Sequence, residues 1–417
     1  MDGGGARMGG FSPKGLAKIG PTLQGVVDKG YLSGVVTLLW RNGKVADVTA
    51  VGKRNLETGA PMTRDTLFRI ASMTKPVTSA VILMLMEEGK LRLDDPITKW
   101  APEFSDMAVL KDPEGALDAT YPTPRAITIE DLLTHRSGLA YAFTSMGPIA
   151  EAYQKALGDV LSTNQDPDDW MRALASLPLS YAPSERFHYS HATDVLGFLA
   201  GRIEGKPIRQ VLFERVFDPL GMVDTDFYVP PAKRGRAAVV YRFDEPSASL
   251  QPVPFPVLEE PPVFCGGGGG LISTADDYLK FARMLLGKGE VDGVRLLKPE
   301  TVELMIENRL TDAQREIPFM GIPFWAGQGF GLGLSVITDA EKQAWMGVGT
   351  NGAFSWPGAF GTWWRADPAE NMVMLYLIQN SIPLEPGAVS QLATGQRLAA
   401  AAALPMFQNL TYTALGR

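Results

Sequence analysis

The sequence predicts an α+β fold in which both ends of the chain build one antiparallel sheet and a mostly helical region is inserted between them. Apolar runs rich in β-branched residues lie at 35–51 and return at 330–378. Residues 95–260 instead carry short helical patterns separated by proline-rich loops. The chain has 417 residues, of which 45% are hydrophobic and 20% charged, which is ordinary for a soluble globular protein of one large or two intertwined domains.

The N-terminal part predicts a helix followed by a hairpin. Residues 14–29 have apolar positions at helical spacing, and Pro21 interrupts them, so we expect one broken helix. Val35–Trp40 and Val45–Val51 are β-branched runs that flank Asn42-Gly43. An Asn-Gly pair between two such runs is a strong hairpin signal.

The next elements follow from composition and capping. Ser72–Glu88 is apolar on all sides and stops at Gly89, which predicts a helix buried all round. Thr128, with Asp131 three residues later, predicts a capped helix start. Further helices are expected at 194–203, 209–216, 275–286 (after five glycines, 266–270) and 389–403, strands within 330–337, 360–365 and 372–378, and a loop with short strands at 229–262.

This order of elements suggests two domains. We expect residues 1–71 and 262–417 to form a discontinuous sheet domain, flanked by the terminal helices. Residues 72–261 would form the helical domain. A cleft between two such parts is the expected place for an active site.

Charge and composition exclude several classes of function. Acidic residues outnumber basic ones by 46 to 39, and the net charge of −7 would repel nucleic acid and anionic lipid. One cysteine, Cys265, and three histidines exclude an internal disulfide and leave little material for a metal site. No apolar stretch approaches the roughly 18 residues of a membrane span. Met1–Gly10 is glycine-rich with no apolar stretch after it, so we expect a cytoplasmic location.

Ser72 and Lys75 are the first candidates for chemistry. Residues three apart on a helix share a face, so the Lys75 amine can reach the Ser72 hydroxyl and help to remove its proton. Pro76 is tolerated only in the first helical turn, which places the helix start, with its positive end, at Ser72. The alternative is that Ser72 merely caps the helix.

Two later segments are weaker candidates. A tyrosine such as Tyr189 acts as a base only where a cation lowers its pKa, and Lys75 would supply one; otherwise the ring packs in a turn. Gly358 lies beside a predicted strand, where the Ala359 N–H, together with that of Ser72, would form an oxyanion hole. A hairpin bend is the alternative. His135 has no obvious serine partner and is expected to be structural.

The order of these segments resembles a known superfamily. Ser-x-x-Lys at 72–75, Tyr-x-His at 189–191 and Trp-x-Gly at 356–358 follow one another as in the serine β-lactamases and penicillin-binding proteins. Within that superfamily the chain looks most like the class C β-lactamase-like esterases, called family VIII carboxylesterases. The stretches 67–75, 89–96, 131–139, 268–275 and 360–368 support the resemblance, which spans about residues 20 to 400.

The resemblance implies a serine β-lactamase-like fold with the nucleophile in the cleft between two domains. It implies that Ser72 is acylated and that Lys75 and Tyr189 handle protons, with no metal or organic cofactor. Lactamases have asparagine where His191 stands and a lysine or histidine where Trp356 stands. Because the residue that would pair with a β-lactam carboxylate is an indole here, uncharged esters are favoured.

The predicted function is therefore hydrolysis of short-chain acyl esters through a serine acyl-enzyme. The alternatives are a β-lactamase or D-amino-acid peptidase, an acyltransferase that uses the same acyl-enzyme, and a catalytically silent binding protein. The partner is a small-molecule ester, and the sequence leaves the oligomeric state open. We expect Trp356, Gly358, His191, Tyr141 and Phe143 to bind substrate. Aromatic residues near the cleft, with Phe324 and Trp325 among them, predict a small apolar acyl pocket.

Overall fold

A computed structural model describes residues 8–382 and 396–416. Two helices, α1 (Pro13–Leu16) and α2 (Ile19–Asp28), replace the single broken helix that we expected. The break lies between them and not at Pro21, which sits in the first turn of α2, where a missing N–H costs little.

The predicted hairpin is confirmed. Strands β1 (Gly34–Arg41) and β2 (Lys44–Gly52) pair antiparallel, with Val36 opposite Ala50. The turn residues Asn42 and Gly43 have φ angles of 50° and 83°, in the left-handed region that these two residue types tolerate best.

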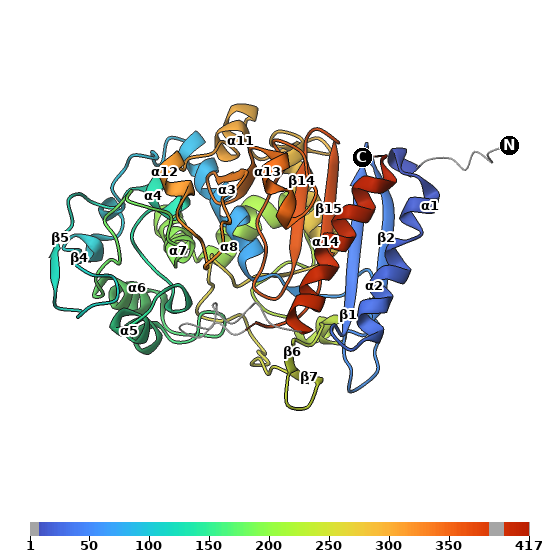
Figure 1. Cartoon of the computed structure of the whole chain (residues 1–417). Coiled ribbons are helices and arrows are strands. Elements are labelled where there is room, and N and C mark those ends of the chain that lie inside the picture. The colour runs from blue at the N-terminus through green and yellow to red at the C-terminus, as the bar shows by residue number, and fades with distance from the viewer. Residues whose placement is uncertain (1–7, 383–395, 417) are drawn as a thin grey trace.

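Both ends of the chain contribute to one antiparallel sheet of seven strands in the order β11-β12-β13-β14-β15-β1-β2 (Figure 1). The C-terminal strands are β11 (Gln328–Phe330), β12 (Ser335–Ile337), β13 (Phe354–Ser355), β14 (Trp363–Asp367) and β15 (Met372–Leu377). The apolar run at 330–337 is therefore two short strands around a turn, and the strand expected at Phe360 begins three residues later, at Trp363.

Helices cover both faces of the sheet. In β1, Val35 and Leu39 pack in the core with α2 and α14 (Gln396–Ala414), whereas Val36 and Leu38 face the other, larger core. Helix α10 (Ala275–Leu286) packs against β1, β14 and β15 and has the bounds that we predicted. The C-terminal helix extends to Ala414, beyond the end at 403 that we expected, and residues 389–395 of its predicted range lie outside the described part of the chain.

The middle of the chain is mostly helical and lies at one end of the sheet (Figure 1). Its main helices are α3 (Thr74–Glu87), α4 (Ile129–Leu133), α5 (Pro148–Leu157), α6 (Pro167–Ala175), α7 (Ala192–Glu204) and α8 (Ile208–Leu212), which continues as a π-helical turn (Phe213–Phe217). The capping box at Thr128 is confirmed. Helix α3 packs against α7, which places the predicted nucleophile segment and the tyrosine segment side by side.

Short strands join distant segments around the start of α3. Strand β3 (Phe68–Arg69) pairs with β8 (Ile272–Ser273), so the chain before Ser72 lies against the chain that follows the glycine run. Strands β6 (Tyr241–Asp244) and β7 (Ser249–Pro252) pair as a hairpin within the stretch 229–262, where we expected a loop with short strands. The domain boundaries at 71/72 and 261/262 stay a prediction. Among residues 8–382 and 396–416, no helix is both long and apolar enough to span a bilayer.

Candidate active site

Ser72 is the partly exposed residue of an otherwise buried segment. Every residue from Ile70 to Leu83 is buried except Ser72, which is partly exposed. Ala71 has a φ of 43°, a left-handed conformation that costs a residue other than glycine about 1–3 kcal/mol. The 3₁₀ turn over Ala71–Met73 then leads into α3, so the Ser72 hydroxyl lies at the N-terminal end of a long buried helix.

Two proton-carrying groups meet at this hydroxyl. Lys75 Nζ lies 3.1 Å from Ser72 Oγ, and Tyr189 OH lies 2.6 Å from the same atom. Ser72 comes from the 3₁₀ turn before α3, Lys75 from the first turn of α3, and Tyr189 from the segment just before α7. The structure thus brings together the serine, lysine and tyrosine that the sequence pointed to.

Lys75 is fully buried and donates to three oxygen atoms. Besides Ser72 Oγ, its Nζ donates to Tyr141 OH at 2.9 Å and to the Gly268 carbonyl at 2.6 Å. Within the described part of the chain, no carboxylate forms an ion pair with this amine. These three contacts fix the direction of the amine toward the serine.

Tyr189 also contacts Trp356. The indole Nε1–H donates to Tyr189 OH at 3.0 Å, and Lys75 Nζ lies 4.6 Å from the centre of the Tyr189 ring. Trp356 is only 2% exposed. In the structure the indole is buried and its N–H is directed at the tyrosine hydroxyl, and the expected contact of Trp356 with substrate stays a prediction.

Tyr141 and Phe143 also lie inside the site. Tyr141 is 2% exposed, and burial raises the pKa of its phenol well above the ordinary value, so it is neutral at pH 7. Phe143 stacks on it with ring centres 4.7 Å apart. We expected both to bind substrate; in the structure Tyr141 holds Lys75, and Phe143 supports Tyr141.

His191 is paired with a carboxylate that sequence reasoning missed. Its Nδ1 lies 2.8 Å from Asp194 Oδ2, and both side chains are buried. Asp194 Oδ1 accepts the Gly268 N–H at 2.8 Å. We expected His191 to bind substrate; in the structure it forms this internal pair, and its contact with substrate stays a prediction. The position of Asp194, three residues after His191 in the first turn of α7, was the available signal.

The Trp-x-Gly segment lies against the serine turn. A Cβ on Gly358 would come within 2.4 Å of the Ile70 carbonyl oxygen, so only glycine fits here. Ala359 packs in a small apolar cluster with Ala71 and Phe360. The segment expected to supply the second oxyanion donor is therefore next to the turn that carries Ser72.

His135 lies behind Tyr189. Its Nδ1 is 3.3 Å from Ser190 Oγ, so the expectation that it has no serine partner is wrong. Its ring meets the Tyr189 ring edge-on, with centres 4.9 Å apart. Burial, aided by the nearby Lys75 cation, holds the pKa of His135 well below its usual value, so the imidazole is neutral and packs as an aromatic ring.

Other rings fill the space beyond Tyr189. The group comprises Phe187, Phe319, Phe324, Trp325, Phe330 and Trp356, which pack edge to face or stack on one another. Trp325 is 2% exposed. None of the six lines the cavity of about 880 Å³ that opens elsewhere beside the serine turn.

A partly exposed serine whose hydroxyl meets a buried lysine and a tyrosine, beside an antiparallel sheet, defines a serine hydrolase of the β-lactamase-like fold. The family model described as Beta-lactamase matches residues 21–397, and the chain belongs to this family. Within the described residues, no group of three or more His, Cys, Asp or Glu side chains is placed to hold a metal ion.

Similar proteins include curated relatives and a solved structure. Protein Rv1367c of Mycobacterium tuberculosis is 53% identical over 95% of this chain and 98% of its own length. Esterase EstB of Burkholderia gladioli is 32% identical over 83% of this chain and 86% of its own. The structure of "EstCE1, a hydrolase with promiscuous acyltransferase activity" superposes with a TM-score of 0.76 at 27% identity, over 94% and 98% of the two chains. These relatives place the chain in the esterase and acyltransferase group of the family.

Proposed function

We propose that this protein is a carboxylic ester hydrolase that cleaves short-chain acyl esters through an acyl-enzyme on Ser72. The observation that carries the proposal is the pair of contacts at Ser72 Oγ, 3.1 Å from Lys75 Nζ and 2.6 Å from Tyr189 OH. Such contacts are those of an activated nucleophile with its base. The esterase name of the Burkholderia gladioli relative supports the same reaction class.

The first half-reaction forms the acyl-enzyme. Ser72 Oγ attacks the ester carbonyl carbon while its proton passes to Lys75 Nζ or Tyr189 O, one of which must enter the step without its own proton. The carbonyl oxygen becomes an oxyanion, which the backbone N–H groups of Ser72 and Ala359 stabilise. The bond from carbon to the alcohol oxygen then breaks, and the proton returns to that oxygen, so a neutral alcohol leaves.

The second half-reaction returns the free enzyme. A water molecule gives a proton to the same Lys75 and Tyr189 unit and attacks the acyl carbon. The bond to Ser72 Oγ breaks, the proton goes back to the serine, and a carboxylic acid leaves. The same proton path thus serves both halves, as microscopic reversibility requires.

The environment of Tyr189 favours small acyl groups that carry no charged group next to the ester carbonyl. Trp356 occupies the position where lactamases have a cation. Its indole is buried, and the indole N–H donates a hydrogen bond to Tyr189 OH. The packed rings around Phe319 and Phe324 leave little room on that side. A series of p-nitrophenyl esters from acetate to palmitate tests this preference, with Ser72→Ala as the inactive control. A rise in kcat/KM from butyrate to palmitate would contradict it.

Acyl transfer is the second candidate, because an alcohol can replace water in the second half-reaction. The structurally similar EstCE1 is itself described as a hydrolase with promiscuous acyltransferase activity. Adding a primary alcohol to a p-nitrophenyl butyrate assay separates the two. Release of p-nitrophenol without formation of a new ester would assign hydrolysis, and a new ester would assign transfer.

A further inference from the structure

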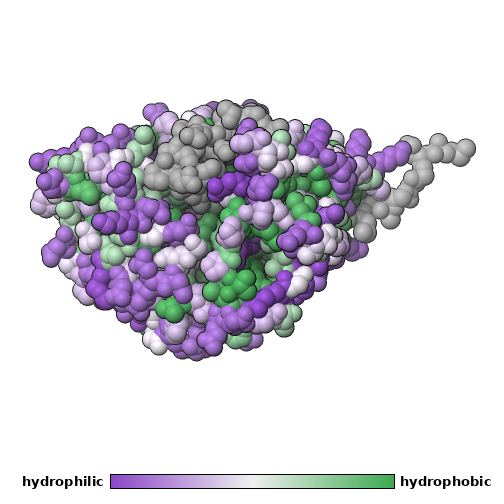
Figure 2. Space-filling model, turned by 90° about the horizontal axis from the view of Figure 1, so that it is seen from below, coloured by the Kyte–Doolittle hydropathy of each residue, from purple (hydrophilic) through white to green (hydrophobic). Residues whose placement is uncertain are grey.

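A large apolar cavity opens beside the serine turn. It measures about 880 Å³, within the range of sites for drug-sized ligands. Its walls come from the proline-rich segment 252–258, the segments 160–164, 227–229 and 237–240, and the glycine run. Figure 2 shows the face that carries the β6–β7 hairpin, where hydrophobic residues gather around a hollow.

The cavity borders the nucleophile. Ala71, the residue before Ser72, packs in one cluster with Val240, Val253 and Phe255. These three neighbours line the cavity, whereas Ala71 does not. Gly269, which also lines it, directly follows the glycine that accepts from Lys75. The cavity therefore begins next to the turn that carries Ser72, although Ser72 itself is not part of its lining.

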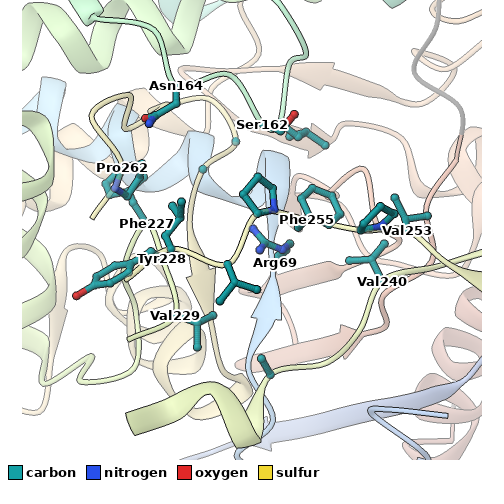
Figure 3. A pocket seen from close by; sticks show the side chains of 18 of the residues that line it. Arg69, Ser162, Asn164, Phe227, Tyr228, Val229, Val240, Val253, Phe255 and Pro262 are labelled. Carbon is teal, nitrogen blue, oxygen red and sulfur yellow. The ribbon is translucent and has the colours of Figure 1, made fainter. Parts of the chain in front are cut away.

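Arg69 brings a positive charge into this apolar space. Figure 3 shows its side chain between Phe227 and Val229 on one side and Phe255 and Val253 on the other. Its guanidinium carbon lies 4.3 Å from the centre of the Phe255 ring. No carboxylate among residues 8–382 and 396–416 pairs with this guanidinium. Burial lowers the pKa of Arg69 to about 10, so it remains charged at pH 7.

Hydrogen bonds to its main chain hold Arg69 in place. Its N–H donates to Gln379 Oε1 at 2.9 Å, and Gln379 Nε2 donates to the Arg69 carbonyl at 3.0 Å. The pairing of β3 with β8 fixes Arg69 opposite Ile272. These contacts use the main chain and leave the guanidinium donors free for a ligand.

The other charged groups of the cavity are already compensated. Arg234 lies 3.0 Å from Glu259. Asp194 is bonded to His191 and to the Gly268 N–H. Among the described lining residues, Arg69 is therefore the charged side chain that has neither a hydrogen-bond nor an ion-pair partner. A planar guanidinium in a desolvated site is suited to a carboxylate, which it binds through two parallel hydrogen bonds.

We propose that this cavity is a substrate subsite in which Arg69 binds a free carboxylate, so that the preferred substrates are half-esters of dicarboxylic acids. The inference rests on the proposed ester hydrolysis and specifies its substrate class. It is compatible with the absence of a cation at Trp356, because Trp356 does not line this cavity. The anionic group is accepted at the far end of the acyl chain and not beside the scissile carbonyl.

A kinetic comparison tests the subsite. Mono-p-nitrophenyl esters of succinate, glutarate, adipate and suberate are compared with p-nitrophenyl esters of the monocarboxylic acids of equal chain length. We expect at least one half-ester to exceed its neutral counterpart in kcat/KM. In Arg69→Gln this half-ester should lose about 10- to 100-fold, the range for one charge-assisted contact, while the neutral ester changes less than about threefold. Arg69→Lys, which keeps the charge, should restore part of the loss.

A matched control removes one positive charge elsewhere. Arg64 forms an exposed ion pair with Asp276 and does not line the cavity, so Arg64→Gln should leave the ratio of the two esters unchanged. Neutral esters hydrolysed faster than every half-ester by the wild type would overturn the proposal. Equal losses for both esters in Arg69→Gln would also overturn it, because they would show a structural role only.

Binding to an inactive variant separates this inference from the proposed function. Titration calorimetry of Ser72→Ala with the half-ester, repeated with Ser72→Ala/Arg69→Gln, reports the contact without turnover. If the wild type hydrolyses no ester but the single variant binds the half-ester in an Arg69-dependent way, ester hydrolysis fails and the carboxylate subsite stands. If both variants bind equally, the subsite fails even though the esters are hydrolysed.

Discussion

Asp194 and Lys75 bind the two polar groups of one residue, Gly268. Asp194 Oδ1 accepts the Gly268 N–H at 2.8 Å, and the Gly268 carbonyl accepts from Lys75 Nζ at 2.6 Å. A Cβ on Gly268 would lie 2.9 Å from Asp194 Oδ1, so glycine permits this close approach. The carboxylate thus positions the catalytic amine without touching it.

Replacing Asp194 should therefore slow the chemical step more than it weakens substrate binding. We expect Asp194→Ala to lower kcat on p-nitrophenyl butyrate about 10- to 100-fold with a small change in KM, since a misplacement of about 1 Å has this effect. Asp194→Asn, which keeps an acceptor for the Gly268 N–H, should recover part of the rate. Steady-state kinetics checks both, with Asp168→Ala, an exposed carboxylate in an ion pair with Arg202, as the control. Wild-type kcat in Asp194→Ala would contradict the positioning role.

Ser72 is expected to be the single covalent nucleophile, because it alone is exposed in its buried segment. A serine-reactive phosphonate should add one adduct to the intact mass, and digestion should map it to the peptide that carries Ser72. Ser72→Ala should take up no adduct and lose its esterase activity. An adduct on any other serine would refute the assignment.

Lys75 and Tyr189 should behave as one unit, because both contact the same oxygen atom, Ser72 Oγ. Lys75→Ala or Tyr189→Phe should each lower kcat about 10²- to 10⁴-fold. The double variant should lose little more than the worse single one, since the two groups share one proton path. Single-turnover kinetics of all three variants measures the coupling, and additive losses would indicate independent roles.

Local signals predicted much of the fold. The hairpin around Asn42-Gly43, the capped start at Thr128 and the bounds of α10 all depend on residues within a few positions of one another. The break in the first helix was misplaced because proline is harmless in a first turn. The run at 330–337 was not resolved into two strands because its turn contains apolar residues as well as glycine.

The proximity of Ser72, Lys75 and Tyr189 was also accessible from sequence, because the spacing and order of their motifs are distinctive. The contacts of the surrounding side chains were not. Tyr141 and Trp356 were expected to face substrate, whereas their hydroxyl and indole groups bind Lys75 and Tyr189. These two hydrogen bonds join residues that are 66 and 167 positions apart in the chain. No local sequence pattern determines which polar side chains form such long-range contacts.

The stability of the fold should decrease in mild acid because of His188. Burial lowers the pKa of His188 to about 4, whereas an unfolded histidine titrates near 6.5. Between these values the unfolded chain binds the extra proton, so stability falls as the pH falls, by up to about 1.4 kcal/mol per pH unit. His188→Gln should therefore show a smaller fall in Tm from pH 7 to pH 5 than the wild type. An identical fall in both proteins would exclude this contribution.

β-Lactams should be poor substrates, because the carboxylate beside a β-lactam ring would meet a buried indole where lactamases have a cation. We expect nitrocefin to be turned over with a kcat/KM about 10- to 100-fold below that of p-nitrophenyl butyrate, as for the loss of one charge-assisted contact. Lysine at position 356 would be desolvated among Phe319 and Phe330. Trp356→His is the better test, since imidazole keeps a ring N–H for Tyr189 and can carry a charge. It should raise the ratio of nitrocefin to butyrate turnover relative to Trp356→Phe, which reduces the ring without adding a cation. If the wild-type protein already hydrolyses nitrocefin faster than the ester, the chain is a β-lactamase with an unusual third motif and not an esterase.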